Sequence, residues 1–270
     1  MSTVKIMRIF ALSDLHTDFA ENWRRLQRIP LASYSQDALV VAGDIADDLN
    51  IIAKTLRLLQ TRFNQVFYVP GNHELWVRND CYHSLEKFSR IISLCDELGV
   101  HTRPARAGET WIVPLFSWYE PGYDEDHSAD SSELEGWADF YFCKWPAEIE
   151  SVADHFLKIN EPNIKAYDGP VITLSHFLPR RELLPPVSEL RFKGLPLVAG
   201  SPALDRQIRA LNAVTHVFGH SHISYDQVID GIRYVHHVLG YPRESEPSDF
   251  SLKLIWGSGS ETENLPQELK

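Results

Sequence analysis

Short apolar runs alternate along this chain with longer segments in which apolar residues recur every three or four positions. The runs are rich in β-branched and aromatic residues, which is typical of strands buried on both faces of a sheet. They occupy residues 5–12, 38–42, 65–70, 110–116, 170–174 and 215–218. The intervening segments predict amphipathic helices over residues 49–63, 80–98, 147–160 and 201–212. Since strands and helices alternate first and β-rich sequence follows, the pattern predicts a mixed α/β fold.

Three local signals set the ends of these elements. Gly99 follows the second helix in the position of a C-terminal cap, and Ser201-Pro202 begins the last helix with an N-cap and a proline. The pair Asp230-Gly231 predicts a tight hairpin near the C-terminus.

The segment 118–150 differs from the rest because it is acidic and dense in aromatic residues. We interpret it as an insert within a single domain over residues 1–258, with a flexible polar tail at 259–270. The insert could cap a binding cleft and stack on a planar group, but ordinary local packing is the interpretation that we favour.

Composition narrows the classes of function. The chain has 270 residues and lacks both a signal peptide pattern and an apolar run of about 20 residues, so we expect neither export nor a membrane span. Its three cysteines show no CxxC spacing, which favours a reducing, cytoplasmic location. A net charge of −11 argues against binding to nucleic acid or to an anionic membrane, although a local cationic site could still attract an anionic substrate.

Polar residues that can bind metals follow five of the predicted strands, at the point where each strand ends. In open α/β sheets, active sites form beyond the carboxyl ends of the strands, so we expect these side chains to converge. In chain order they are Asp14, His16, Asp44, Asn72, His73, His176, His220 and His222.

These residue types fit one kind of metal chemistry. Carboxylates with imidazoles and no thiolate suit Mn, Fe, Zn, Ni or Co. Seven candidate ligands, all of these residues except His73, are too many for one catalytic ion with an open position. They predict two divalent or mixed-valence ions, with Asp44 bridging because a carboxylate has two oxygens.

The ordered blocks D-x-H, GD, GNHE, H and GHSH, from Asp14 to His222, resemble the signature of the calcineurin-like metallophosphoesterases. The resemblance spans most of the chain. It implies a four-layer α/β/β/α sandwich of two mixed sheets flanked by helices. It also implies one ion held by Asp14, His16, Asp44 and His222, and a second held by Asp44, Asn72, His176 and His220.

The resemblance also makes His73 a catalytic histidine that binds no metal. We expect a hydroxide activated by the metals to attack phosphorus while His73 assists the leaving oxygen, with Asn72 and His73 both contacting the substrate. The predicted substrate is a small-molecule phosphodiester. The alternatives are a phosphomonoester, a phosphoprotein or a non-catalytic scaffold; the intact ligand positions favour an enzyme.

Residues near these blocks allow two interpretations each. Arg180 could bind a substrate phosphate or could be a solvated cation that pairs with the acidic insert. Asp47 could orient a histidine or cap helix 49–63, and Asp48 is expected to cap. Glu74 is expected at the surface or around the metals. His216 and His237 are expected in the core or on a strand surface.

Overall fold

The computed structural model describes residues 7–78, 83–124, 129–244 and 250–257. The described strands form two sheets. The four-stranded sheet has the order β10-β1-β2-β3 and the six-stranded sheet the order β4-β5-β6-β7-β9-β8. The first contains β1 (Ile9–Leu12), β2 (Ala38–Ala42), β3 (Gln65–Val69) and β10 (Lys253–Trp256). The second contains β4 (Ala105–Ala107), β5 (Thr110–Pro114), β6 (Val171–Leu174), β7 (Ala213–Val217), β8 (Tyr225–Ile229) and β9 (Ile232–His236).

Both sheets are mixed. The strands β1, β2 and β3 run parallel while β10 is antiparallel to β1. In the other sheet β5, β6, β7 and β9 run parallel, and β4 and β8 form antiparallel edges.

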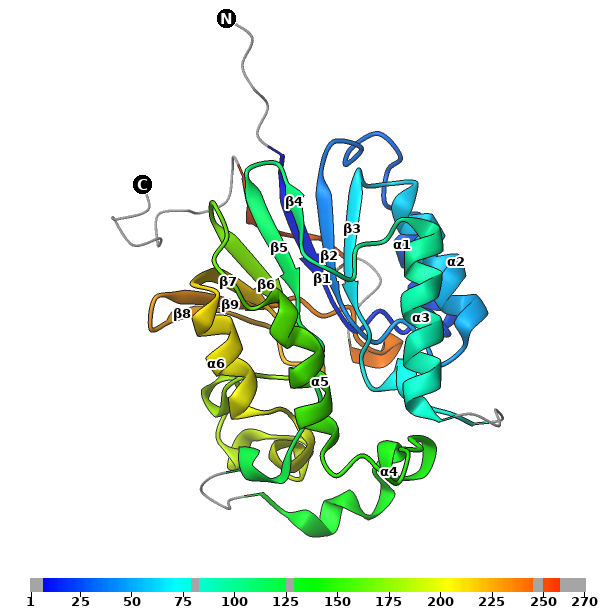
Figure 1. The fold of residues 1–270 in the computed structure, drawn as a ribbon. Coiled ribbons are helices and arrows are strands. Elements are labelled where there is room, and N and C mark those ends of the chain that lie inside the picture. Colours follow the sequence, from blue (N-terminus) through cyan, green and yellow to red (C-terminus); the bar gives the residue numbers. More distant parts are fainter. Residues whose placement is uncertain (1–6, 79–82, 125–128, 245–249, 258–270) are drawn as a thin grey trace, which may run out of the picture.

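Helices cover the outer face of each sheet, and the two inner faces pack against each other (Figure 1). On the four-stranded sheet lie α1 (Ala20–Gln27), α2 (Leu49–Gln60) and α3 (Ser84–Leu98), and on the six-stranded sheet lie α5 (Val152–Asn160) and α6 (Pro202–Ala210). The short α4 (Ala138–Phe142) lies apart from both, beyond one end of the sheets. This arrangement confirms the predicted α/β/β/α sandwich.

Alternation along the strands of the second sheet divides its side chains between two cores. Ile112 and Val217 face the first sheet and belong to the larger core, whereas their neighbours Val113 and Phe218 pack toward α6 with Leu204. Because successive side chains of a strand point to opposite faces, a central strand must be apolar at every position. That is why the sequence shows continuous apolar runs rather than alternating ones.

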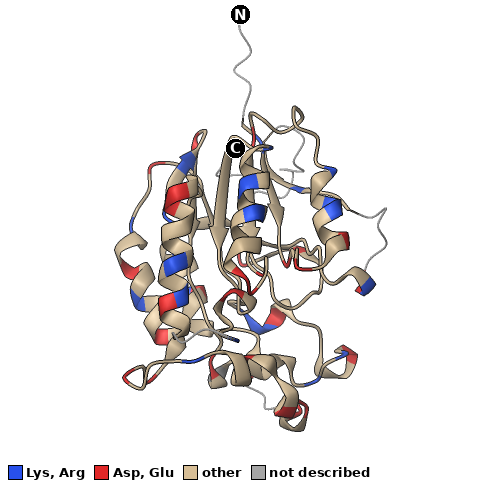
Figure 2. Ribbon diagram, turned by 90° about the vertical axis from the view of Figure 1, so that its right-hand side faces the viewer, with Lys and Arg blue, Asp and Glu red and all other residues tan. Residues whose placement is uncertain are grey.

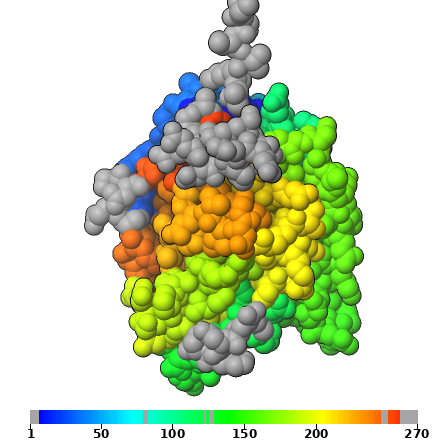
Figure 3. Space-filling view, turned by 90° about the vertical axis from the view of Figure 1, so that its left-hand side faces the viewer, coloured from blue at the N-terminus to red at the C-terminus, as the bar shows by residue number. Residues whose placement is uncertain are grey.

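The predicted local signals are confirmed. Asp48 caps α2 by accepting hydrogen bonds from the backbone of Asn50 and Ile51. Ser201 caps α6, and Gly99 ends α3 in the left-handed conformation with φ 71°. The hairpin at Asp230-Gly231 joins β8 to β9. The surface of this hairpin faces the viewer in orange in Figure 3, beside α6 in yellow.

Some boundaries and elements differ from the prediction. The fourth predicted strand ends at Pro114 rather than residue 116, and the third predicted helix begins at Val152 rather than residue 147. The second predicted helix begins at Ser84 in the described part of the chain, since residues 79–82 lie outside it. Among the helices and strands, α1, α4, β4 and β10 were not predicted. The helix α1 begins after Phe19, which offers no capping side chain, so its start carries no sequence signal.

The insert 118–150 packs partly into the main cores. Trp118 joins the larger core and Tyr123 joins the core beneath α6. The remainder forms short helices, a 3-10 segment at Ser131–Gly136 and α4. The single-domain boundary stays a prediction, and the predicted tail at 259–270 lies outside the described residues.

Other global features bear on the predicted class of protein. Cys95 and Cys143 are free thiols, and Cys81 lies outside the described residues. No helix in the described ranges is long and apolar enough to cross a membrane. Figure 2, turned by 90° from the view of Figure 1, shows acidic and basic residues interspersed on the helices that face the viewer. The expected lack of nucleic-acid binding stays a prediction.

Candidate metal centre

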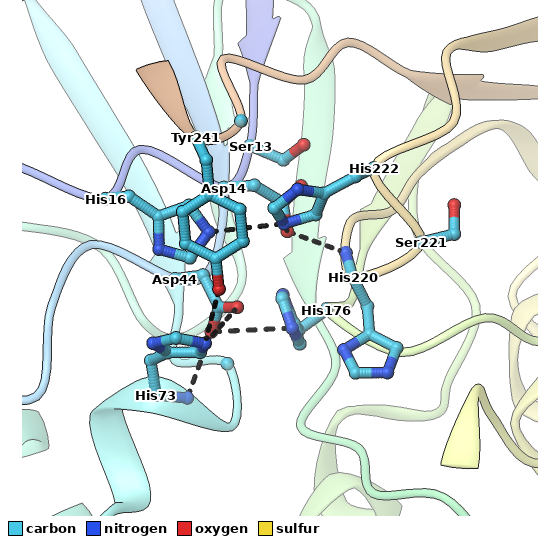
Figure 4. Close-up of polar contacts among 12 residues, drawn as sticks. Ser13, Asp14, His16, Asp44, His73, His176, His220, Ser221, His222 and Tyr241 are labelled. Carbon is cyan, nitrogen blue, oxygen red and sulfur yellow. Dashed lines mark hydrogen bonds and ion pairs between the residues drawn. The ribbon is translucent and has the colours of Figure 1, made fainter. Parts of the chain in front are cut away.

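The loops that follow the strands hold five of the predicted ligands in the left-handed backbone region. The φ angles are 54° for Asp14, 41° for His16, 57° for Asp44, 72° for His220 and 55° for His222. Each such non-glycine residue costs of the order of 1–3 kcal/mol, so it persists only where surrounding structure fixes it. The chain is therefore bent sharply at each ligand position, which turns the side chains toward one another (Figure 4).

Two glycines let these loops approach closely. A Cβ atom at Gly43 would lie 2.4 Å from Nδ1 of His176, and one at Gly71 would lie 2.2 Å from Oδ1 of Asp44. Gly43 also has a φ of 82°, whereas Gly71 is needed for space alone. Larger residues at either position would push the candidate ligands apart.

Four predicted ligands form the first cluster. Asp14, His16, Asp44 and His222 each offer one ligand atom, and these atoms lie within 4.8 Å of one another. The Nε2 atoms of His16 and His222 are 3.2 Å apart, and Nε2 of His222 is 3.5 Å from Oδ1 of Asp14. Nδ1 of His222 lies 2.7 Å from the carboxylate of Glu244, and donation there leaves Nε2 free as an acceptor.

A second cluster brings together Asn72, His176 and His220. Nδ1 of His176 donates to the carbonyl of Ala42 at 2.9 Å, and Nε2 of His220 donates to the carbonyl of Val198 at 2.9 Å. In neutral imidazoles the other nitrogens are then acceptors. Both face Oδ1 of Asn72, at 3.0 Å from His176 and 3.1 Å from His220.

These contacts test whether the residues fit a cation. Three acceptor atoms converge within hydrogen-bond distance, and no proton remains to be shared among them. Burial, the main cause, lowers the pKa of His176 to about 4 and that of His220 well below its usual value, so both are neutral at pH 7. A positive ion placed among the three atoms would remove their mutual repulsion, and oxygen with imidazole nitrogen is a suitable donor set for a transition metal. The residues therefore fit the predicted second ion.

Asp44 lies between the two clusters. Oδ1 of Asp44 is 3.5 Å from Nε2 of His176, while Asp44 also belongs to the cluster with Asp14. Burial, and then the charges of Glu74 and Asp14, raise the pKa of Asp44 well above its usual value. Carboxylates crowded in this way are unfavourable by themselves, and bound cations would reverse that balance. The position suits a bridging ligand.

His73 lies beside Asp44 on a 3-10 turn at His73–Leu75. Its backbone N–H donates to Oδ1 of Asp44 at 3.1 Å, and its Nε2 is 3.9 Å from Oδ2 of Asp44. The ring packs on Trp76 with centroids 3.7 Å apart. Nε2 also faces the hydroxyl of Tyr241 at 3.3 Å (Figure 4). Because its side chain is 15% exposed, His73 can meet a substrate beside the two clusters.

The insert supplies a buried carboxylate that sequence reasoning missed. Asp139 on α4 accepts hydrogen bonds from Nδ2 of Asn72 at 2.9 Å, Nε1 of Trp76 at 2.6 Å and Nε1 of Trp137 at 2.9 Å. Since a carboxylate only accepts, Asn72 must direct its NH₂ group toward Asp139 and its carbonyl oxygen toward the histidines. No short motif could have revealed this contact, which joins residues 67 positions apart.

Three further supporting residues were missed or left without a role. Glu74 is fully buried and accepts from the backbone N–H groups of Gly71, Asp44 and Ile45, so it ties two ligand loops together rather than lying at the surface. His236 donates to Oδ2 of Asp14 at 3.0 Å and receives the hydroxyl of Ser221 at 3.2 Å. Tyr241 stacks on His16 with centroids 4.3 Å apart.

Arg180 does not join the site. Its guanidinium pairs with Glu182 at 2.7 Å and Asp230 at 2.8 Å, and it lines a different pocket together with Asp205. The predicted substrate contact therefore has no support in the structure, and the pairing is not with the acidic insert either. Arg180 is occupied by carboxylates of its own loop and of the β8-β9 hairpin.

The other uncertain residues lie around the centre or away from it. Asp47 pairs with Arg78, so it neither caps α2 nor orients a histidine. His216 is buried and bonded to Thr173 and Ser175. His237 bonds to the carbonyl of Ser251. The last two positions agree with the expected core and strand-surface placements.

A cleft of about 760 Å³ lies over the two clusters. Its floor includes Asp44, Asn72, His73, His220 and His222. Trp137 of the insert contributes to its wall, so the insert does border the cleft as well as packing locally. The site can therefore admit a ligand directly onto both predicted metal positions.

Comparisons with known proteins agree with this geometry. The sequence profile described as calcineurin-like phosphoesterase matches residues 7–224. A curated relative, the [acyl-carrier-protein] phosphodiesterase PptH of Mycobacterium tuberculosis, is 31% identical over 266 residues covering 87% of this chain and 78% of that protein. The crystal structure of phosphopantetheinyl hydrolase PptH from the same organism aligns with a TM-score of 0.77 at 27% identity, over 93% of this chain and 96% of its own.

A second solved structure aligns with a TM-score of 0.50 over 93% of this chain at 18% identity, which is a likeness of fold alone. The profile match and the relative together extend over most of the sequence. They show that the chain belongs to the calcineurin-like phosphoesterases, a family of metal-dependent enzymes that hydrolyse phosphoric esters.

Proposed function

We propose that this enzyme cleaves a phosphodiester that joins a phosphopantetheinyl chain to a carrier protein. The relative that matches 87% of the chain is named for an acyl-carrier-protein phosphodiester, and the related solved structure for phosphopantetheinyl hydrolysis. The sequence favoured a small-molecule substrate. The proposal replaces that expectation with a protein-bound diester.

The observation that carries the chemistry is the convergence of acceptor atoms on either side of Asp44. We assign Asp14, His16, Asp44 and His222 to one ion, and Asp44, Asn72, His176 and His220 to the other, as the family resemblance implies. When bound, such ions would withdraw charge from the phosphoryl oxygens and lower the pKa of water toward neutrality. The assignment predicts that His220 and His222, two residues apart, serve different ions.

The residues of the chain then perform the remaining tasks. As a water oxygen bonds to phosphorus, the bond from phosphorus to the leaving oxygen breaks, and that oxygen needs a proton or a hydrogen bond. We assign this task to His73, because its ring borders the cleft and its Nε2 lies 3.3 Å from the hydroxyl of Tyr241. Asn72 is held by Asp139 with its oxygen toward the histidines.

The free thiols of Cys95 and Cys143 support the predicted cytoplasmic location.

The experiment compares three substrates with protein loaded with Mn²⁺. They are a carrier protein bearing the phosphopantetheinyl chain, bis-p-nitrophenyl phosphate and p-nitrophenyl phosphate. We expect release of phosphopantetheine, seen as the mass loss of the carrier, at a rate that falls by about 10²-fold or more in His73→Ala.

The outcomes separate the alternatives. Hydrolysis of the model diester without any release from the carrier would overturn the proposed substrate and leave a diesterase of other specificity. Preference for p-nitrophenyl phosphate would favour a phosphomonoesterase. If neither model ester is cleaved above the level of His73→Ala, the assigned role of the metal centre is wrong.

A further inference from the structure

The cleft extends beyond the residues that the chemistry uses. One wall comes from the segment between β6 and α6, which includes the 3-10 turns at Val187–Glu189 and Leu195–Val198. Further lining residues come from the segment after β9 and from residue 223. The apolar side chains of this outer part, here called the arm site, are Trp137, Pro185, Leu190, Phe192, Leu195 and Ile223.

Two aromatic rings form a fixed surface at the inner end of the arm site. Trp137 and Phe192 stack in parallel, with centroids 5.4 Å apart and an interplanar angle of 5°. The indole N–H of Trp137 is held by Asp139, and the ring lies edge-on to His220 with centroids 5.9 Å apart. The aromatic surface therefore begins at a predicted metal ligand. A group attached to a phosphate at the metal centre would meet it first.

Cations border the same cleft. Arg191 and Arg243 both line it, as do the carboxylates of Glu189 and Glu244. Arg243 lies over the ring of Tyr241 at 5.5 Å. In a protein of net charge −11, the two guanidinium groups offset these carboxylates and offer hydrogen-bond donors to an anionic diester.

The cleft is larger than a phosphate alone requires. Sites for small molecules measure about 300–1,000 Å³ and are mostly apolar, with a few polar groups that fix orientation. The volume of this cleft, about 760 Å³, falls in that range, and its lining holds the charged residues Glu189 and Arg191 beside the apolar ones. The occupant should thus be a phosphate with an attached chain whose apolar parts meet the arm site.

We propose that the arm site binds the pantetheine chain of the substrate, an extended chain of methyl and amide groups attached to the scissile phosphate. This inference rests on the proposed function for the identity of the chain. The stacked rings of Trp137 and Phe192 would contact the part nearest the phosphate. Leu190 and Leu195 would contact the part further along, and the carrier protein would stay outside the cleft.

Two diesters that share a leaving group test the arm site. One is the p-nitrophenyl ester of phosphopantetheine and the other is methyl p-nitrophenyl phosphate, so only the arm differs. We expect the wild-type protein, loaded with Mn²⁺, to prefer the first in kcat/KM. In Phe192→Ala this preference should fall by about tenfold, mainly through KM. The control Phe140→Ala changes an exposed aromatic residue of the insert that does not line the cleft, and its preference should match the wild type.

Binding gives a second measurement that needs no turnover. Titration of Mn²⁺-loaded protein should show tighter binding of phosphopantetheine than of inorganic phosphate, and Phe192→Ala should reduce that ratio of affinities by about tenfold. An unchanged ratio in Phe192→Ala, or equal affinities in the wild type, overturns the arm site. Failure to act on the holo carrier protein, with these ratios intact, instead overturns only the proposed carrier substrate.

Discussion

Asp139 fixes the orientation of Asn72, a proposed metal ligand, and is not itself one of the proposed ligands. Its carboxylate is 2% exposed and holds the amide of Asn72, so the oxygen of that amide faces His176 and His220. An amide has two possible orientations that differ by a flip, and only one presents an oxygen to a cation. Asp139 selects that orientation from a segment that is otherwise peripheral to the sandwich.

The first prediction concerns Asp139→Asn. An asparagine can accept fewer of the three hydrogen bonds, so Asn72 should lose its fixed orientation. We expect the affinity of the second metal position to fall by about 10- to 100-fold, and added Mn²⁺ to restore much of the activity. Activity measured against Mn²⁺ concentration checks this. Asp130→Asn, which changes an exposed carboxylate of the same insert, should leave the dependence of activity on Mn²⁺ concentration unchanged. A loss that excess metal does not repair would contradict a role through Asn72.

Tyr241 is placed to orient the predicted catalytic histidine. Its ring stacks on His16, and its hydroxyl lies 3.3 Å from Nε2 of His73. Tyr241→Phe keeps the stacking and removes the hydroxyl contact. If the hydroxyl aligns His73 toward the leaving oxygen, the variant should slow diesters with alkyl leaving groups by about three- to tenfold.

The dependence of the rate on the leaving group distinguishes a positioning role of Tyr241 from a general disturbance of the site. Diesters that release p-nitrophenolate need little proton assistance, so Tyr241→Phe should affect them much less. When the logarithm of the rate is plotted against the pKa of the leaving group, the slope should therefore be steeper in the variant. Tyr141→Phe, an exposed residue of the insert, is the control. Parallel plots for wild type and Tyr241→Phe would exclude the positioning role.

At the scale of elements, the strand ends could be predicted from the sequence because each apolar run stops at a polar residue. Other elements could not be predicted in this way. The strand β10 pairs with β1 across more than 240 positions, and its partner could not be identified from local pattern. The contacts of Asp139, Glu74 and His236 depend in the same way on tertiary structure. The proposed ligands could be named from the sequence because their blocks form an ordered signature.

An ion cluster joins the two sheets at one edge. Asp226 on β8 pairs with Arg233 on β9 at 2.7 Å and with Lys253 on β10 at 2.6 Å. Burial by itself raises the pKa of Asp226, but the hydrogen bonds and charges of Arg233 and Lys253 outweigh it and lower the pKa to about 2. The cluster therefore stabilises the native state only while Asp226 is ionised.

We predict that Asp226→Asn lowers the free energy of unfolding by about 0.2–1 kcal/mol at pH 7, because the group is partly exposed to solvent. Since the folded pKa lies below the unfolded value of about 3.9, this difference should hold above pH 5 and shrink as the pH falls toward 2. Urea unfolding with EDTA present, at several pH values, measures it. Glu148→Gln serves as the control for loss of an exposed charge. A difference that grows on acidification would refute the assignment.

At the scale of the whole molecule, the metal centre lies where loops from both sheets meet. Asp14 and Asp44 follow strands of the four-stranded sheet, and His176 and His220 follow strands of the six-stranded sheet. Metal ions held by these residues would connect the two halves of the sandwich. Binding to the native state alone stabilises it by about 2.7 kcal/mol for each site when free metal is 100-fold above its Kd.

Chelation should therefore lower the melting temperature of the protein. Asp44→Asn, which removes the proposed bridge, should lower metal content at both positions and should respond much less to EDTA than the wild type does. Metal analysis beside thermal unfolding measures both effects. Two full equivalents of metal in Asp44→Asn would contradict bridging, and an unchanged melting temperature after verified metal loss would contradict a link between the sheets.

The left-handed backbone at five proposed ligand positions lowers the stability of the apo protein, while it places side chains that the proposed reaction needs. Glycine would adopt these conformations without strain, so replacing His16 or His222 by glycine should relieve local strain while abolishing turnover. We expect the apo form of His16→Gly to unfold at the same or a higher temperature than apo wild type. A higher melting temperature of this variant would show that the proposed ligands are held at a cost to the stability of the apo protein, which bound metal would offset.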